Sequence, residues 1–271
     1  MRTRRTENLC DAVAGELGRR IVAGEIAPGQ PVPTQAELCE QLRVSRTTVR
    51  EAMMRLQGKG LVEARPRDGV RVLPTPRWNQ FDADVLAWRT ATGRVDPDLL
   101  DQLYEIRTCF EPRACALAAE RSDDAGREAI RAQFVVIVDP SSSSARRIQA
   151  DLAFHLEIFA ATRNIFFVSL GAAIKTALAM SFRISQNRAG ISGTEIRLHG
   201  SVCEAILAGD APRAEASMHA LLHESKETAR HAAKSKGLER DDRTVAARAR
   251  SASGDIRPAY ERLVLRRPTD R

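Results

Sequence analysis

The chain has 271 residues and a formal net charge of +7 at pH 7, with 43% hydrophobic and 28% charged side chains. This composition excludes an intrinsically disordered chain, and no apolar run reaches the ~20 residues that a membrane-spanning helix needs. The scattered cysteines, odd in number, argue against a disulfide framework and indicate reduced thiols in a cytoplasmic protein: Cys10, Cys39, Cys109, Cys115 and Cys203.

The positive charge is concentrated at the two ends of the chain. Residues 1–76 have a net charge of +4, residues 77–233 of −2 and residues 234–271 of +5. A basic end favours a nucleic-acid-binding surface, although a solvated charged face explains it equally well. At roughly 100–200 residues per domain, the length predicts one large domain or two ordinary ones.

The N-terminal segment predicts two helices separated by a turn. Residues 8–23 place apolar side chains at four-residue steps, which is typical of an amphipathic helix: Leu9, Val13, Leu17 and Ile21. Pro28 and Gly29 predict the turn that follows. Thr34 and Glu37 have the spacing of a capping box, so a second, short helix is expected to begin there.

A third helix is expected directly after a tight turn, because Ser45 is a favourable N-cap. Arg46, Thr47 and Arg50 fall outside the apolar stripe of this helix, and two of them lie in its first turn. The stripe that it is expected to bury consists of Val49, Met53 or Met54, and Leu56. Two helices joined by a short turn, the second with polar side chains at its start, predict a helix-turn-helix.

Two short β-type segments, LVEAR and GVRVL, follow this helix and are separated by PRD. They predict a hairpin with Arg65 and Arg67 at its tip, and therefore a winged helix-turn-helix. An arginine at the start of a groove-binding helix can bond two acceptors of guanine, whereas hydroxyls and wing arginines suit phosphate oxygens. The alternative is a generic helical domain with surface arginines.

The segment GEIAPGQPVPTQAELCEQLRVSRTTVREAMMRLQGKGLVEARPRDGVRV resembles the DNA-binding half of the GntR family of bacterial transcription regulators. The resemblance implies DNA contacts from the third helix and support from the wing. The expected DNA-binding residues are Thr34, Ser45, Arg46, Thr47, Arg50, Arg65, Arg67 and Gly69. Where relatives often carry a DNA-contacting arginine, this chain has Ala36, so we expect a different operator preference.

Four parts of the chain are predicted: a DNA-binding domain over 1–75, a linker over 76–95, a helical effector domain over 96–234 and a basic, disordered tail over 235–271. In the linker, Trp78 and Trp88 are expected to anchor a short helix on the second domain. The stretch RWNQFDADVLAWR is similar to the same part of family members that control galactonate catabolism.

The second domain is expected to be an antiparallel bundle of six helices, because its apolar pattern is helical and its breaks are regular. It resembles the FCD domain, the effector-sensing half of the FadR subgroup, in LYEIRTCFEPRACALAAERS, DLAFHLEIFAATRN and LHGSVCEAILAGDAPRAEASM. The predicted fold is therefore mostly α, with a winged helix-turn-helix followed by this bundle. The expected helices are 98–120, 123–138, 145–162, 165–189, 194–208 and 211–233.

Asp151 and His155 are four residues apart on one expected helix, so both project from the same face. Such a pair either shares a divalent metal with ligands from other helices or forms a surface salt bridge. The FCD resemblance implies a metal such as zinc and adds His199 as a ligand. It also implies a third histidine where this chain has Leu221.

His219 and His223 lie two residues before and after that position, so they are expected to face away. A three-ligand site would complete its shell with water or effector oxygens. Without metal, the same three side chains would hydrogen-bond effector hydroxyls.

Arg107 is a second candidate for effector binding, because a guanidinium can clamp a carboxylate with two hydrogen bonds. The alternative is a salt bridge to Glu111 one turn later. Resemblance to the E-x-R motif of the family, here Glu105 and Arg107, implies the ligand role. Asn164 also matches a family position, although a helix cap explains it equally well.

The favoured function is a ligand-responsive repressor that binds operator DNA as a homodimer and is released by a sugar acid such as galactonate or gluconate. A metal-dependent hydrolase built on the Asp/His cluster is the enzymatic alternative, but no HExxH, nucleophile elbow or glycine-rich phosphate loop is visible. A regulator that senses a different carboxylate and an architectural DNA-binding protein without ligand also fit the pattern.

Overall fold

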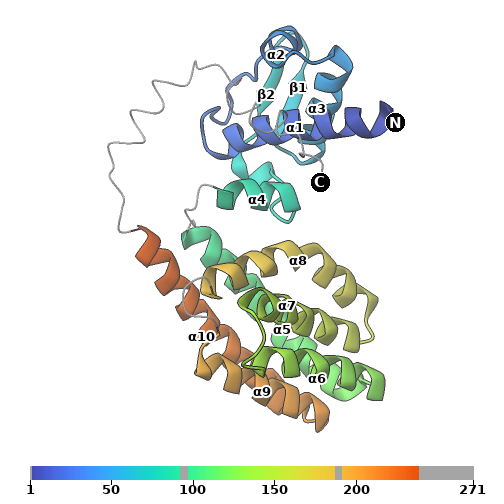
Figure 1. Cartoon of the computed structure of the whole chain (residues 1–271), viewed down its shortest axis with the longest axis vertical. Coiled ribbons are helices and arrows are strands. Elements are labelled where there is room, and N and C mark those ends of the chain that lie inside the picture. The colour runs from blue at the N-terminus through green and yellow to red at the C-terminus, as the bar shows by residue number, and fades with distance from the viewer. Residues whose placement is uncertain (1, 92–96, 187–190, 238–271) are drawn as a thin grey trace. The chain divides into compact units, whose positions relative to one another are not determined.

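The computed structural model describes residues 2–91, 97–186 and 191–237, which form two compact units (Figure 1). The N-terminal unit is described over 2–91, and the C-terminal unit over the two later ranges. The predicted tail lies outside the described residues from residue 238 onward. None of the described helices combines the length and the hydropathy of a membrane span.

Three helices and a hairpin build most of the N-terminal unit, as the sequence predicts. The helices are α1 (Arg2–Val22), α2 (Gln35–Leu42) and α3 (Arg46–Gly58), and the strands are β1 (Val62–Arg65) and β2 (Gly69–Val72). The strands pair in antiparallel register, with Val62 opposite Val72. The two expected caps are present: Thr34 and Glu37 form the capping box of α2, and the side chain of Ser45 accepts the backbone N–H of Thr48.

The core of this unit is formed where the predicted apolar stripes of α1, α2 and α3 meet the hairpin. Val49, Met53 and Leu56 of α3 are buried, whereas Met54 is 62% exposed, which decides between the two methionines. The three helices and the hairpin therefore share one core.

The segment after the hairpin packs on the N-terminal unit. It contains a short 3-10 turn, Thr75–Arg77, and the helix α4 (Ala83–Ala91). Trp78, Val85 and Trp88 belong to the N-terminal core, so the expectation that the tryptophans anchor on the second domain was wrong. The sequence could not show that Gly18 on α1 leaves room for the indole of Trp88.

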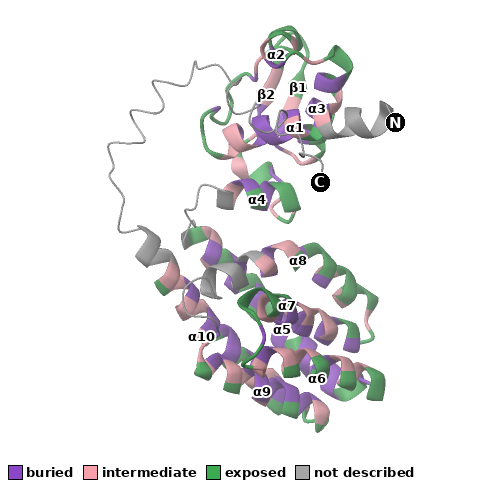
Figure 2. Ribbon diagram, in the orientation of Figure 1, coloured by how far each residue is buried: buried purple, intermediate pink, exposed green. Residues whose placement is uncertain are grey.

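The C-terminal unit is a bundle of six helices close to the predicted ranges. These are α5 (Pro97–Arg121), α6 (Asp124–Val138), α7 (Ser144–Ala161), α8 (Ile165–Gln186), α9 (Gly193–Leu207) and α10 (Ala211–Gly237). Helix α5 packs against α7, α9 and α10, and α7 also packs against α6 and α8. The buried residues lie where neighbouring helices face each other (Figure 2). This arrangement brings α5, α7 and α9 together around the polar site described next.

Candidate functional site

The first candidate site is the start of α3 in the N-terminal unit. Helix α3 begins at Arg46 because Ser45 caps it. Arg43, two residues before Ser45, adopts a left-handed conformation with φ 53° that ends α2. The side chains of Arg46, Thr47 and Arg50 are all exposed. The helix therefore presents two guanidinium groups and a hydroxyl to solvent, as base and phosphate recognition requires.

The wing completes this surface, and its tip is a tight turn. Arg67 has φ 63° and Gly69 has φ 76°, and glycine adopts such a left-handed conformation without strain. Arg65 and Arg67 are exposed, although the guanidinium of Arg65 donates to Glu63 over 2.6 Å. The exposed Thr34 hydroxyl donates to Glu37 over 2.8 Å, so its first role is in the capping box.

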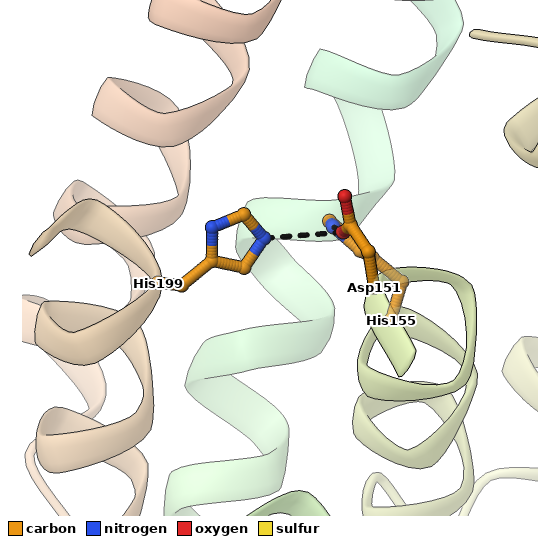
Figure 3. A group of neighbouring side chains, drawn as sticks. All are labelled: Asp151, His155 and His199. Atoms are coloured by element: carbon orange, nitrogen blue, oxygen red, sulfur yellow. Dashed lines mark hydrogen bonds and ion pairs between the residues drawn. The ribbon is translucent and has the colours of Figure 1, made fainter. Parts of the chain in front are cut away.

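The second candidate site is a buried cluster in the C-terminal unit. Asp151 and His155 project from α7 towards His199 on α9 (Figure 3). One ligand atom from each of the three residues lies within 4.8 Å of the others. The exposed fractions are 4%, 2% and 3%, so the surface salt bridge considered from sequence is excluded.

The geometry of the two histidines fits metal binding. Each Nε2 faces Asp151 Oδ1, at 3.1 Å from His199 and 3.5 Å from His155. Each Nδ1 has a separate partner: the backbone oxygen of Glu195 lies 2.8 Å from His199, and Glu111 Oε2 lies 2.7 Å from His155. Metal-ligating histidines typically donate their other ring N–H to a carboxylate or a carbonyl, so the donor set suits a divalent ion.

Interactions between opposite charges stabilise the cluster. Burial raises the pKa of the Asp151 carboxyl, but the charge of His199 and hydrogen bonds from both histidines lower it well below its ordinary value. Burial lowers the pKa of His155, but the neighbouring carboxylates of Glu111 and Asp151 raise it to a net value above the ordinary one. Asp151 is therefore an ionised carboxylate that can accept hydrogen bonds or bind a cation.

Arg107 lies inside the bundle and is only 1% exposed. Its Nε donates to Glu111 Oε1 over 2.6 Å, its Nη2 to Oε2 over 3.3 Å and its Nη1 to Ser181 Oγ over 3.2 Å. The guanidinium carbon also lies 5.0 Å from the centre of the Tyr104 ring. The salt bridge to Glu111 considered from sequence is thus present, and it is buried.

The sequence predicts Glu111 only as an alternative ion-pair partner of Arg107, and its place beside His155 is what sequence reasoning missed. Burial raises the pKa of its carboxyl, but Arg107 and His155 lower it to about 2. The spacing of Glu111 from Arg107 indicates their ion pair, but the contact with His155 depends on the packing of α5 against α7. The structure therefore joins five buried ionisable groups in one chain of contacts: Arg107, Glu111, His155, Asp151 and His199.

Comparisons with known proteins match each unit to a family. The model for bacterial regulatory proteins of the gntR family matches residues 9–72, and the FCD domain matches residues 101–224. The HTH-type transcriptional regulator YieP of Escherichia coli (strain K12) is 33% identical over 219 residues, which cover 80% of this chain and 93% of YieP. The chain belongs to the GntR family. It is a ligand-responsive, DNA-binding transcription regulator and not an enzyme.

Two further proteins are similar to this GntR regulator. The galactonate operon transcriptional repressor of Escherichia coli (strain K12) is 32% identical over 171 residues, which cover 63% of this chain and 74% of the repressor. A solved structure of Lar, which controls expression of the Listeria monocytogenes agr system, covers 81% of this chain and 95% of its own, with a TM-score of 0.54 and 18% identity. The likeness to Lar shows the fold alone.

The remaining predicted residues of the GntR regulator lie as follows. Asn164 Oδ1 accepts the backbone N–H of Phe166 over 2.9 Å, so Asn164 caps α8. Leu221, where the family resemblance implies a histidine, is buried on α10. His219 and His223 are exposed, as expected for side chains that face away. Glu105, the other member of the E-x-R motif, is exposed, whereas Arg107 is buried.

Proposed function

We propose that this regulator is a homodimeric repressor of sugar-acid catabolism that leaves its operator when an aldonate such as galactonate or gluconate binds. The observation that carries the proposal is the buried cluster of Asp151, His155 and His199 inside an FCD unit that follows a winged helix-turn-helix. The galactonate operon repressor, 32% identical, supports the choice of an aldonate. A bacterial repressor binds operator DNA on the chromosome, so we propose that this protein acts in the cytoplasm.

A divalent cation, zinc or a similar ion, is part of the proposal. Asp151, His155 and His199 would hold it, with Leu221 in place of a further histidine. When bound, the ion supplies positive charge and open coordination positions for oxygen ligands. The protein side chains fix where the effector oxygens bind, and the surrounding apolar helices exclude water from them.

Arg107 is the proposed partner of the effector carboxylate. It lies close enough to Asp151 for their charges to interact, so it belongs to the same electrostatic site. Its Nε and Nη2 engage Glu111, and therefore a carboxylate that binds this fork must displace Glu111. Asn164 is retained as a candidate effector contact, in addition to its role as a cap.

The proposed DNA-binding surface consists of the start of α3 and the wing. Arg46, Thr47 and Arg50 would enter the major groove, and Ser45 would contact the backbone at the helix start. Thr34, Arg65, Arg67 and Gly69 would contact phosphates beside the groove. A homodimer would place two such surfaces on a two-fold operator.

A titration of aldonates against operator-bound protein tests the effector. The operator would be selected from a pool of random duplexes, and its binding followed by fluorescence anisotropy with each acid. We expect one aldonate to weaken binding, whereas the matched sugar alcohol, which lacks the carboxylate, should not. If no acid changes operator binding or the melting temperature, the sensor proposal is wrong. Turnover of an acid would likewise contradict the proposal.

Metal analysis tests the cation separately. The purified full chain and its Asp151→Ala variant would be loaded with zinc, dialysed and measured by elemental analysis. We expect about one zinc ion per chain in the natural protein and a clear loss in the variant, because one of three ligands is removed. Equal metal content in the two proteins would contradict the site.

A further inference from the structure

The buried chain of ionisable groups contains one member, Glu111, that is neither a proposed metal ligand nor a proposed effector contact. Glu111 lies on α5, whereas the three metal-site residues lie on α7 and α9. Its carboxylate bridges two cations or potential cations: Oε1 lies 2.6 Å from Arg107 Nε, and Oε2 lies 2.7 Å from His155 Nδ1. Glu111 and Arg107 are 2% and 1% exposed, so solvent does not compete for these contacts.

The position of Glu111 affects which nitrogen of the His155 imidazole carries the proton and which can bind a metal. A neutral imidazole carries one proton, and the negative charge of a carboxylate 2.7 Å from Nδ1 favours the tautomer with that proton on Nδ1. Metal binding requires the neutral imidazole, and the lone pair of that form is then on Nε2, the nitrogen that lies 3.5 Å from Asp151 Oδ1. Rotation of the ring or the other tautomer would break the contact with Glu111 and leave a buried carboxylate with one partner fewer.

We propose that Glu111 is a positioning residue that fixes His155 with Nε2 directed at the metal site, while Arg107 balances the buried charge of Glu111. This inference rests on the metal site proposed above. A carboxylate in this position orients the ring and raises its basicity as a ligand, and loss of such a partner typically lowers metal affinity about 10–100-fold. His199 has a backbone oxygen in the same role, from Glu195.

Cobalt binding to the full chain tests the inference, because the visible spectrum of Co²⁺ reports the geometry of its ligands as well as its affinity. We would titrate Co²⁺ into the natural protein, Glu111→Gln and Glu105→Gln. Glu105 is a matched control, since it is a carboxylate on the same helix that is exposed. We expect Glu111→Gln to bind Co²⁺ about tenfold or more weakly with an altered spectrum, and Glu105→Gln to match the natural protein.

A second variant covers the case in which Glu111→Gln fails to fold around the unbalanced Arg107. The double substitution Arg107→Met with Glu111→Met removes both charges, and such apolar replacement of a buried ion pair is often neutral for stability. We expect this variant to melt like the natural protein without metal and to bind Co²⁺ more weakly. If either folded variant binds Co²⁺ with natural affinity and spectrum, the role of Glu111 is overturned. If the natural protein itself binds no Co²⁺ or Zn²⁺, the proposed metal site fails, and the inference with it.

Discussion

Leu221 lies where the family resemblance implies a further metal-ligating histidine. It is 2% exposed on α10. We predict that Leu221→His raises zinc affinity about tenfold or more, because a fourth protein ligand completes a tetrahedral shell and loss of even an outer partner costs about 10–100-fold. Competition with a zinc indicator measures this. Leu222→His, equally buried and one residue further, should leave the affinity unchanged, and an equal gain in both would refute the assignment.

Arg46 is the residue on which sequence-specific DNA recognition is expected to depend most. We predict that Arg46→Ala weakens binding to a selected operator by about 1–3 kcal/mol and relaxes discrimination at one base pair. Arg55→Ala is the control, because Arg55 lies on the same helix but pairs with Asp11 of α1. Anisotropy titrations with operator and random duplexes measure both. An equal loss on random DNA would make Arg46 a phosphate contact instead.

At the scale of residues, the sequence predicts what depends on local spacing. Asp151 and His155 share a helix face, and Arg107 and Glu111 form an i,i+4 pair, so both pairings can be expected from sequence. The contact between Glu111 and His155 joins α5 to α7 and cannot be expected in that way. The sequence also does not predict that Glu105 of the E-x-R motif is exposed, because a motif does not show which of its side chains faces the core.

At the scale of elements, the helices and the hairpin follow from caps, apolar periodicity and turn residues, whereas the packing of α4 does not. Lys59, at the end of α3, lies 2.8 Å from carboxylate oxygens of both Asp82 and Asp84, and its ammonium lies 5.9 Å from the centre of the Trp88 ring. These contacts connect residues more than twenty positions apart. The apolar pattern of α4 shows only that one face is buried, and it does not show against which unit.

We predict that Gly18→Ala destabilises the N-terminal unit by about 1–3 kcal/mol, the usual cost of overpacking, because the new Cβ would overlap the Trp88 indole. The control is Gly15→Ala on the same helix, where the added Cβ meets the flexible end of Arg19 at 3.4 Å. This control should be neutral or stabilising by up to about 1 kcal/mol. Urea unfolding followed by tryptophan fluorescence measures both variants. Equal stability of the two would show that α4 does not pack on Gly18.

At the scale of the whole molecule, we expect the N-terminal unit to bind DNA and the C-terminal unit to bind the effector. Both tryptophans, Trp78 and Trp88, belong to the N-terminal core. The buried polar side chains of Arg107 and Tyr104 belong to the C-terminal bundle. Tryptophan fluorescence therefore reports on the DNA-binding unit alone, and a response to effector would show that binding in one unit changes the other. The sequence predicts both sites. Their coupling depends on two conformations of the protein that bind the ligand with different affinities, and a sequence pattern does not show these conformations.

We predict that the coupling is reciprocal. If an aldonate weakens operator binding by a given factor, typically about 5–150-fold for an allosteric pair, a saturating operator must weaken aldonate binding by the same factor. Calorimetric titration of the aldonate with and without operator gives one factor, and operator anisotropy with and without saturating aldonate gives the other. The control is the Arg46→Ala variant, measured at a duplex concentration that is too low for this variant to bind DNA. Under this condition, added duplex should leave its aldonate affinity unchanged. Unequal factors in the natural protein would mean that the aldonate acts otherwise, for example by changing the oligomeric state, because linkage between two sites on one species requires them to be equal.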